Sequence, residues 1–508
     1  MNTTSKDNVD DPKAMEQEPT ESPSVPQNFR IQAITDYLAS SLWVQALYGG
    51  AGGFFLYFSM YALRKPFKAA KFVDEETGEK LMFFGSNMTL KTAIVLFQLI
   101  GYMSSKWIGI KVVSEAKGKQ DIYLAILAIV AELALVLYGI LGQAKDPSWT
   151  PFPMLINGLM LGMVWGLTVA YFEGRTTSDF SLVCLSISFI VSSGIVKDVA
   201  LVVLDWGVDQ FWMPSVVGLL FFPLYFFCIL MLNQLPPPTK LEELDKANRI
   251  VMTHQSRLDY FLKFWPGLLA LWIGVMFLTA YRDYRDTFAV EIFEDLGYES
   301  EPGNLSKSES LVAGILLIPI AALVFCKNNL LAFQLSMLSL MLGSVLLLLS
   351  VYIFLGSEYS GFSYYVLTGV ASYLAYVPYN SVLYERLIAV LHEPCNIAYL
   401  MAVMDALGYL GVFVLYFVAE FGDFDGHLDA YNKVGQVFGF VTLAVYIGAC
   451  VYFFIFKRDI LFVRDGKQAA GDHDQNAEAT KVYDEKVEPP TQSELNPSEQ
   501  AEELEYEA

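Results

Sequence analysis

The feature that most constrains this chain is a series of long apolar blocks with few or no charges. The first, from Leu42 to Leu63, runs 22 residues without a charged side chain, and Tyr123 to Gly142 carries only Glu132. A helix needs roughly 20 apolar residues to cross a bilayer, and it satisfies its own backbone hydrogen bonds there. The alternating pattern that marks the strands of a membrane β-barrel does not occur. We therefore predict an all-α membrane protein.

The apolar blocks fall into two sets of six, separated by a polar stretch that opens with three prolines, residues 236–238. This predicts about twelve transmembrane helices in two six-helix bundles, a design that places a ligand site between the halves near the middle of the membrane. The predicted spans lie near residues 42–68, 87–108, 121–142, 152–173, 180–204, 211–233, 262–288, 310–326, 329–355, 362–385, 397–419 and 434–456.

Composition separates two acidic tails from the apolar body. Residues 1–36 hold seven acidic and three basic side chains, and residues 468–508 hold twelve and two, so they supply −4 and −10 of the net charge of −21. Segments this polar cannot repay the entropy of ordering, and we predict disorder. The predicted parts are an N-terminal tail (1–36), a first bundle (37–233), a cytoplasmic linker (234–260), a second bundle (261–460) and a C-terminal tail (461–508).

The distribution of basic residues predicts the orientation. Lys and Arg are concentrated in the connections that share a side with both termini and the linker, and cytoplasmic loops are enriched in these residues. We therefore expect both termini in the cytoplasm. The five cysteines are isolated from one another and the four histidines lie outside the predicted spans, so neither a metal site nor a disulfide framework is expected.

The sharpest candidate site lies at the end of the first span. Tyr57, Tyr61 and Arg64 fall at helical spacing on one face, and Lys68 follows one turn later. An arginine offers five donors in a planar fork, which suits a phosphate or a carboxylate. A charge within a span is costly unless it faces a cavity or a partner. The alternative is that Arg64 only reaches toward the membrane surface.

The seventh span ends in a second dense group of charges, Tyr281-Arg282-Asp283-Tyr284-Arg285-Asp286. Arg282 and Arg285 share a helix face, and Arg282 can pair with Asp286 four residues later. We predict that one of the two arginines contributes to the same site as Arg64. The alternative is an internally neutralised cluster at the membrane surface.

Other ionisable residues within spans are candidates for assisting roles. Lys106 in the second span could help to bind an anion. Asp405 in the eleventh span could carry a coupling proton, because burial raises the pKa of a carboxyl group; Lys197 and Asp198 in the fifth span are further candidates. Asp405 could equally pair with Lys197. In the tenth span, the residues that could hydrogen-bond a ligand are Tyr376, Pro378, Tyr379 and Asn380; the alternative is that they only pack against other helices.

The first-span segment Tyr61-Ala-Leu-Arg64-Lys65-Pro-Phe67 resembles the signature of the organophosphate:phosphate antiporters, a branch of the major facilitator superfamily. The layout of residues 37–460 resembles that superfamily, and looks most like a bacterial branch of it. In the antiporters, one arginine from the first span and one from the seventh clamp the phosphate. The resemblance thus implies this role for Arg64 and for Arg282 or Arg285.

Further segments agree with the resemblance or depart from it. Residues 102–108 resemble the family's second-span segment, in which a lysine helps to bind substrate, and Lys106 falls at that position. The family's fifth-span histidine has no counterpart, and Phe189 stands nearest to its place. The loop motif between the second and third spans is degraded, with Ser114 and Glu115 where Asp and Arg are expected.

These features favour a secondary active transporter of a small organic anion, with phosphorylated metabolites as the class implied by the resemblance, working by alternating access in a bacterial inner membrane. The alternative is a transporter-like receptor that binds a ligand without flux and docks a cytoplasmic partner on its acidic C-terminal tail. No nucleotide-binding loop, catalytic-serine motif or zinc-binding helix motif occurs. We therefore expect no enzyme, cofactor or nucleic-acid partner; the expected partners are the bilayer and the solute.

Overall fold

The computed structural model describes residues 30–74, 77–116, 118–172, 175–237, 252, 254–298, 302–356, 360–393, 395–458 and 460. Most of the residues in these ranges lie in helices, which are joined by short connections. The extended pairings in the same ranges are two isolated antiparallel bridges, Val73 with Lys80 and Met82 with Thr89. The predicted all-α fold is confirmed.

The N half comprises residues 42–233 and contains the first six spans. A short helix, α1 (Gln32–Ala39), precedes it. Its spans are α2 (Leu42–Arg64), α3 (Leu90–Glu115), α4 (Gln120–Gly142), the consecutive helices α5 (Pro151–Leu161) and α6 (Val164–Phe172), α7 (Ser178–Asp205) and α8 (Met213–Asn233). Three short 3₁₀ turns lie in its connections, at Pro66–Ala69, Phe83–Gly85 and Pro147–Trp149.

The C half comprises residues 254–456 and contains the second six spans. They are α10 (His254–Thr287), α12 (Asn304–Val324), α13 (Asn329–Gly356), the consecutive helices α14 (Gly361–Ser381) and α15 (Leu383–Leu391), α16 (Ile397–Phe421) and α17 (His427–Val451). A short helix, α11 (Ala289–Asp295), follows α10, and a π-helical turn, Tyr452–Phe456, extends α17.

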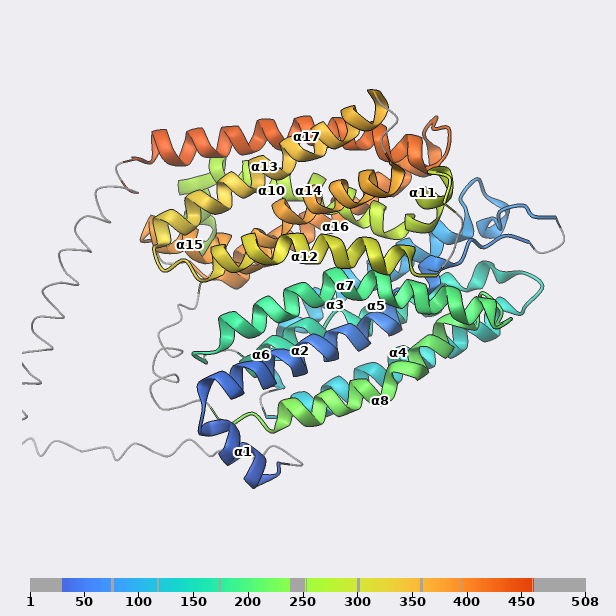
Figure 1. Cartoon of the computed structure of the whole chain (residues 1–508), viewed down its shortest axis with the longest axis horizontal. Coiled ribbons are helices and arrows are strands. Elements are labelled where there is room, and N and C mark those ends of the chain that lie inside the picture. Colours follow the sequence, from blue (N-terminus) through green and yellow to red (C-terminus); the bar gives the residue numbers. More distant parts are fainter. Residues whose placement is uncertain are drawn as a thin grey trace, which may run out of the picture.

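The two halves lie side by side with their helices roughly parallel to one long axis (Figure 1). The N half, blue to green, occupies the lower part of the view and the C half, yellow to red, the upper part. They meet where α7 packs on α12 and where α3 approaches α16. We call the end at which α2 begins and α8 ends the terminus side, and the opposite end, with α11, the loop side.

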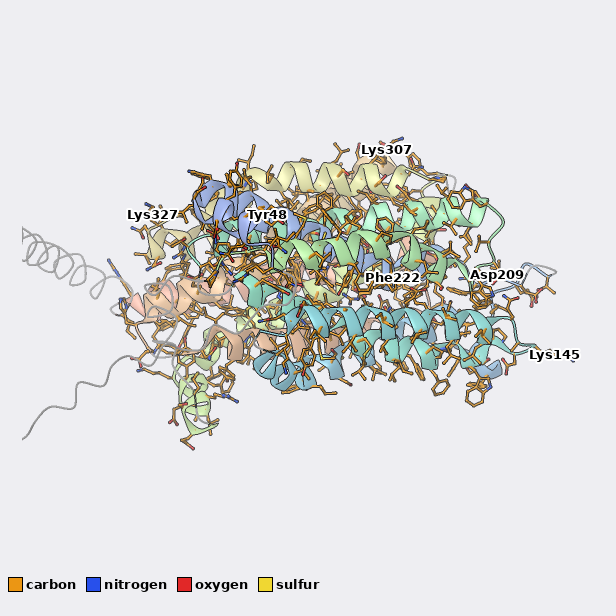
Figure 2. All side chains as sticks on the ribbon, turned by 90° about the horizontal axis from the view of Figure 1, so that it is seen from below. Tyr48, Lys145, Asp209, Phe222, Lys307 and Lys327 are labelled. Atoms are coloured by element: carbon orange, nitrogen blue, oxygen red, sulfur yellow. The ribbon has the colours of Figure 1, made fainter. Side chains whose placement is uncertain are left out.

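An apolar surface surrounds the bundle between two charged ends. In Figure 2, Lys145 and Asp209 lie at the loop side and Lys327 at the terminus side, whereas Phe222 lies between them. Nine helical segments within the described residues are long and apolar enough to cross a membrane by themselves. The spans α2, α3 and α14 are long enough but less apolar, because their interior faces carry glycine, tyrosine, lysine or glutamine. The protein is a multi-pass membrane protein.

Two glycines set the spacing of helices α3 and α5. A Cβ atom added at Gly101 would meet the carbonyl oxygen of Leu155, and one added at Gly158 would meet the carbonyl oxygen of Gln98. The two backbones therefore touch directly, which small residues permit in membrane helix pairs. Gln98, at this contact, also donates its side-chain N–H to the carbonyl oxygen of Arg64 at the end of α2 (3.0 Å).

Two predicted boundaries differ from the structure. The N-terminal tail was expected to extend to residue 36, but α1 begins at Gln32, where Ile31 donates its N–H to Gln234 Oε1 (2.7 Å) after α8. The linker was expected to extend to residue 260, but α10 already begins at His254. The rest of the N-terminal tail, most of the linker and the C-terminal tail lie outside the described residues.

Candidate functional site

A cavity of about 70 Å³ lies between the two halves. Both halves contribute side chains to it, and most of these side chains are charged or aromatic. The lining residues are Tyr57, Tyr61, Arg64, Lys65, Tyr102, Lys106, Trp165 and Phe189 from the N half and Arg282, Asp283, Tyr376, Asn380, Met401, Asp405 and Tyr409 from the C half. Four basic side chains face two acidic ones, so the lining carries a net positive charge.

Arg64 occupies the last residue of α2, where Pro66 cannot supply the N–H that would continue the helix. The carbonyl groups left free there have side-chain donors: Gln98 Nε2 donates to Arg64 O (3.0 Å) and Asn157 Nδ2 to Leu63 O (3.1 Å). The guanidinium stacks 3.8 Å above the ring of Tyr102. These contacts fix the backbone and the plane of Arg64, and no residue in the described part of the chain forms a hydrogen bond with its Nε.

Arg282 lines the same cavity from the C half. Its guanidinium stacks 4.2 Å from the ring centre of Tyr376, and its Nε also lacks a hydrogen-bond partner. Among the described residues, neither Arg282 nor Arg64 makes an ion pair with a carboxylate within 4.0 Å. Two oriented guanidiniums without counter-ions therefore reach one small cavity from opposite halves.

Two predicted site residues lie elsewhere. Arg285 is buried within the C half, where Nη1 bonds Glu309 Oε1 (2.6 Å) and Nη2 bonds Tyr365 O (3.1 Å), so of the two candidate arginines only Arg282 reaches the cavity. Tyr379 donates its hydroxyl to Leu271 O (2.8 Å) in the packing of α14 against α10. Their helix faces point into the C half, and we do not retain either residue in the site.

Lys106 and Asp405 form an ion pair across the two halves (Nζ to Oδ2, 3.3 Å) at the terminus side of the cavity. Their side chains are 28% and 27% exposed. Of the two alternatives that the sequence left open for Asp405, pairing with Lys197 does not occur. Lys197 instead contacts Asp286, with 3.0 Å between Nζ and Oδ1.

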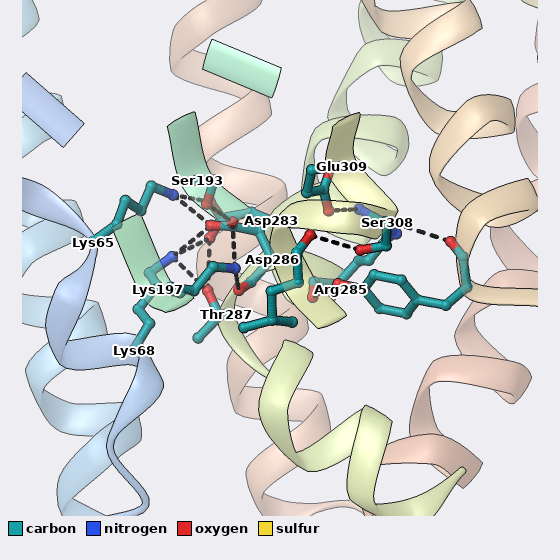
Figure 3. Close-up of polar contacts among 12 residues, drawn as sticks. Lys65, Lys68, Ser193, Lys197, Asp283, Arg285, Asp286, Thr287, Ser308 and Glu309 are labelled. Carbon is teal, nitrogen blue, oxygen red and sulfur yellow. Dashed lines mark hydrogen bonds and ion pairs between the residues drawn. The ribbon is translucent and has the colours of Figure 1, made fainter. Parts of the chain in front are cut away.

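A buried ion cluster joins the halves between the cavity and the loop side (Figure 3). Asp286, at the end of α10, binds three lysines of the N half: Lys65 (2.5 Å), Lys68 (3.3 Å) and Lys197 (3.0 Å). Asp283 lies 3.9 Å from Lys65, and Ser193 also donates to Asp286. We call Lys65, Lys68, Lys197, Asp283 and Asp286 the lysine–aspartate cluster.

Asp198 neighbours this cluster without lining the cavity. Its Oδ2 accepts the backbone N–H of Ser306 (2.7 Å) near the start of α12. The structure thus places Lys197 and Asp198 in the contact of α7 with the C half. Asp405 is the predicted proton-coupling residue that lines the cavity.

Further inter-half contacts lie beyond the cluster on the loop side. Lys91 pairs with Glu291, and Lys71 pairs with Glu294. Glu420 of α16 accepts from the hydroxyl of Thr92 (2.5 Å) at the start of α3. The loop side of the interface is therefore closed by several charged contacts.

Of the aromatic lining, sequence reasoning found Tyr57, Tyr61 and Tyr376. It missed the other aromatic residues of the cavity and the lysine–aspartate cluster. Two of the missed aromatic residues lie one helical turn from a charged residue that was predicted: Tyr102 precedes Lys106, and Tyr409 follows Asp405. A search for aromatic residues four positions from each intramembrane charge would have found them. The cluster had no such signal, because its partners are far apart in the sequence.

Comparison with known structures identifies the fold. The chain is similar to the nucleoside transporter NupG (15% identity, TM-score 0.53, covering 80% of this chain and 99% of that one) and to a D-xylose–proton symporter (13%, 0.52, 80% and 96%). An inward-open structure of the xylose transporter XylE from E. coli matches with 14% identity and a TM-score of 0.50, covering 79% and 96%. The predicted major-facilitator-like arrangement is thereby confirmed. A search of curated proteins gave no significant match.

The sequence itself also matches a protein family. The match spans residues 66–457, from just after α2 to just after α17. It includes most of both halves and eleven of the fifteen residues that line the cavity; Tyr57, Tyr61, Arg64 and Lys65 precede it. The chain belongs to the family described as DUF5690, a family of unknown function.

Proposed function

We propose that this protein is a secondary active transporter of a small organic anion, with a phosphorylated metabolite as the class that best suits its site. The observation that carries the proposal is the pair of guanidiniums, Arg64 and Arg282, that line one cavity from opposite halves and have no carboxylate within 4.0 Å among the described residues. Buried cations are normally paired, so an anionic ligand is the natural partner. Planar forks held by aromatic stacking suit the oxygens of a phosphate.

The surroundings of the two arginines support a transport cycle. The solved structures that share the fold are transporters, not enzymes. On the loop side the halves are joined by the buried lysine–aspartate cluster, whereas the Lys106–Asp405 pair on the terminus side is partly exposed. Alternating access would open these two sets of contacts in turn. The phosphate-antiporter resemblance agrees with the position of Arg64 and assigns Lys106 an assisting role.

We further propose that Asp405 carries a coupling proton. Asp405 lines the cavity, and an anion that attracts Lys106 would deprive this carboxylate of its counter-ion. An unpaired carboxylate in a membrane interior takes up a proton more readily. The proposed location is the bacterial inner membrane, with both termini cytoplasmic; the terminus side would then face the cytoplasm.

Uptake by the purified protein in liposomes tests the function. We expect saturable uptake of glycerol phosphate or inorganic phosphate, and loss of it in Arg64→Ala and in Arg282→Ala. Arg257→Ala is the matched control, because Arg257 is exposed and lies outside the cavity lining. Binding of a phosphate compound, seen as thermal stabilisation, should disappear in the two cavity variants. Wild-type uptake in both of these variants would contradict the proposal.

A further inference from the structure

A second hollow, of about 230 Å³, lies between α3 and α16 beside the central cavity. Most of the residues that line the central cavity are charged or aromatic, whereas the walls of this hollow are mostly apolar. Its apolar walls include Met103 and Trp107 from α3 and Met401, Ala402 and Ala406 from α16. We call this hollow the α3–α16 groove.

The groove and the central cavity are adjacent and share five lining residues. Lys106, Asp405 and Tyr409 line both of them, as do Trp165 and Met401. The Lys106–Asp405 ion pair therefore stands at the junction, with the apolar groove on one side and the arginine-lined cavity on the other. A ligand that occupied both would meet charge at one end and hydrocarbon at the other.

The groove borders the outer surface of the bundle. Trp107 is 64% exposed, and large apolar neighbours on both helices, Ile108 on α3 and Leu410 on α16, are also exposed. In membrane-spanning helices, exposed side chains of this kind face lipid. A phosphate ion or a small sugar phosphate has no group that such a groove would stabilise.

We propose that the α3–α16 groove binds the alkyl chain of a single-chain anionic amphiphile whose head group binds at Arg64 and Arg282. This inference rests on the proposed function and narrows its substrate class from small anions to amphiphilic phosphates. The head group fits the positive, 70 Å³ cavity, and the chain fits the larger apolar space beside it, once the head group has drawn Lys106 away from Asp405. Lys106, at the junction, lies within the site that the head group enters.

The test is the binding of a series of n-alkyl phosphates, from ethyl to octyl, to the full-length protein held in amphipol and measured by calorimetry. Burial of each methylene contributes about 0.8 kcal/mol, so the affinity should rise by up to about fourfold per carbon until the groove is filled. Inorganic phosphate and 1-octanol are the comparison ligands. We expect the first to bind weakly and the second not to compete with ethyl phosphate.

Variants that fill the groove test whether the alkyl chain binds there. Ala402→Phe and Ala406→Phe should abolish the gain with chain length and leave the affinity for ethyl phosphate unchanged. Ala444→Phe places the same bulk on an exposed position of α17 and should preserve the gain. Retained ethyl phosphate binding also shows that each variant is folded. Trp107→Ala, which removes a wall without adding bulk, should reduce the gain for the longer chains.

Each outcome decides a different point. An equal gain with chain length in the groove-filling variants and in Ala444→Phe would overturn the proposal, because the chain would then lie elsewhere. Phosphate binding that depends on Arg64 but not on chain length would also overturn it and leave the proposed function standing. Binding of no phosphate compound by the wild type would overturn both.

Discussion

The lysine–aspartate cluster allows a quantitative prediction about the closed loop side. Asp286 is the shared partner of three lysines, at 2.5, 3.3 and 3.0 Å, and the side chains of all four residues are at least nine-tenths buried. At 3 Å and an effective dielectric constant of 20, each pair is worth about 5 to 6 kcal/mol of Coulomb attraction, much of it offset by desolvation. Removing one partner of a buried pair typically costs about 3–5 kcal/mol, because the other charge is left uncompensated.

The change Asp286→Asn should therefore destabilise the closed loop side by about 3 kcal/mol or more, which is over a hundredfold in the equilibrium between closed and open forms. Lys197→Met combined with Asp286→Leu should recover part of this loss, because one uncompensated lysine is then removed. The paired residues come from opposite halves, so the cost falls on their separation rather than on the folding of either half.

Distances between two spin labels, measured by double electron–electron resonance, can detect the opening of the loop side. Labels at two exposed residues, Lys145 at the loop side of the N half and Lys307 near the start of α12 in the C half, report their separation; the five native cysteines must first be replaced. We expect one short distance in the otherwise unchanged protein and a second, longer population in Asp286→Asn. The same single distance in both, with equal thermal stability, would refute the reasoning.

Three further predictions concern other parts of the chain. Gly158→Val should lower the thermal stability, because the added Cβ meets the Gln98 carbonyl and overpacking costs about 1–3 kcal/mol, whereas Gly448→Val, with open space around it, should not; equal melting temperatures would rule out the close α3–α5 contact. Asp405→Asn should make uptake in liposomes independent of an imposed pH gradient while exchange of unlabelled for labelled anion continues, and retained gradient dependence would exclude Asp405 as the proton carrier. A green fluorescent protein fused to the C-terminus should fluoresce in bacterial cells and a periplasmic phosphatase fusion should stay inactive; the reverse pattern would invert the proposed orientation.

The fold could be predicted from the sequence because hydrocarbon imposes a simple rule. Any uncharged run as long as Leu42–Leu63 must become a helix, and the number and order of such runs then fix the two halves. The boundaries at Gln32 and His254 could not be predicted in the same way. Both helices begin in polar sequence, where docking against the rest of the protein decides whether a segment is ordered.

The site could be predicted only in part. Arg64, Lys106 and Asp405 stand out because a charge within an apolar span requires an explanation, and the structure brings them to one cavity. Arg282 and Arg285 could not be separated, since three residues along a helix leave both on nearly the same face. What distinguishes them is Glu309 of α12, which binds Arg285 (2.6 Å) and which sequence spacing cannot place.

The cavity and the lysine–aspartate cluster share the ends of the same two helices, and this has a consequence for binding. Arg64 and Lys65 are adjacent in the chain, and Arg282 lies one helical turn before Asp286 on α10. A movement that separates Lys65 from Asp286 must therefore also change the position of the two guanidiniums. If an anion binds the closed form more tightly than the open form, saturation with that anion must shift the equilibrium toward the closed form by the ratio of the two affinities, because the coupling free energy is reciprocal. Titrating a phosphate compound against the two distance populations of Asp286→Asn measures this shift, and populations that stay unchanged at saturating anion would show that the two sites are not coupled through these helix ends.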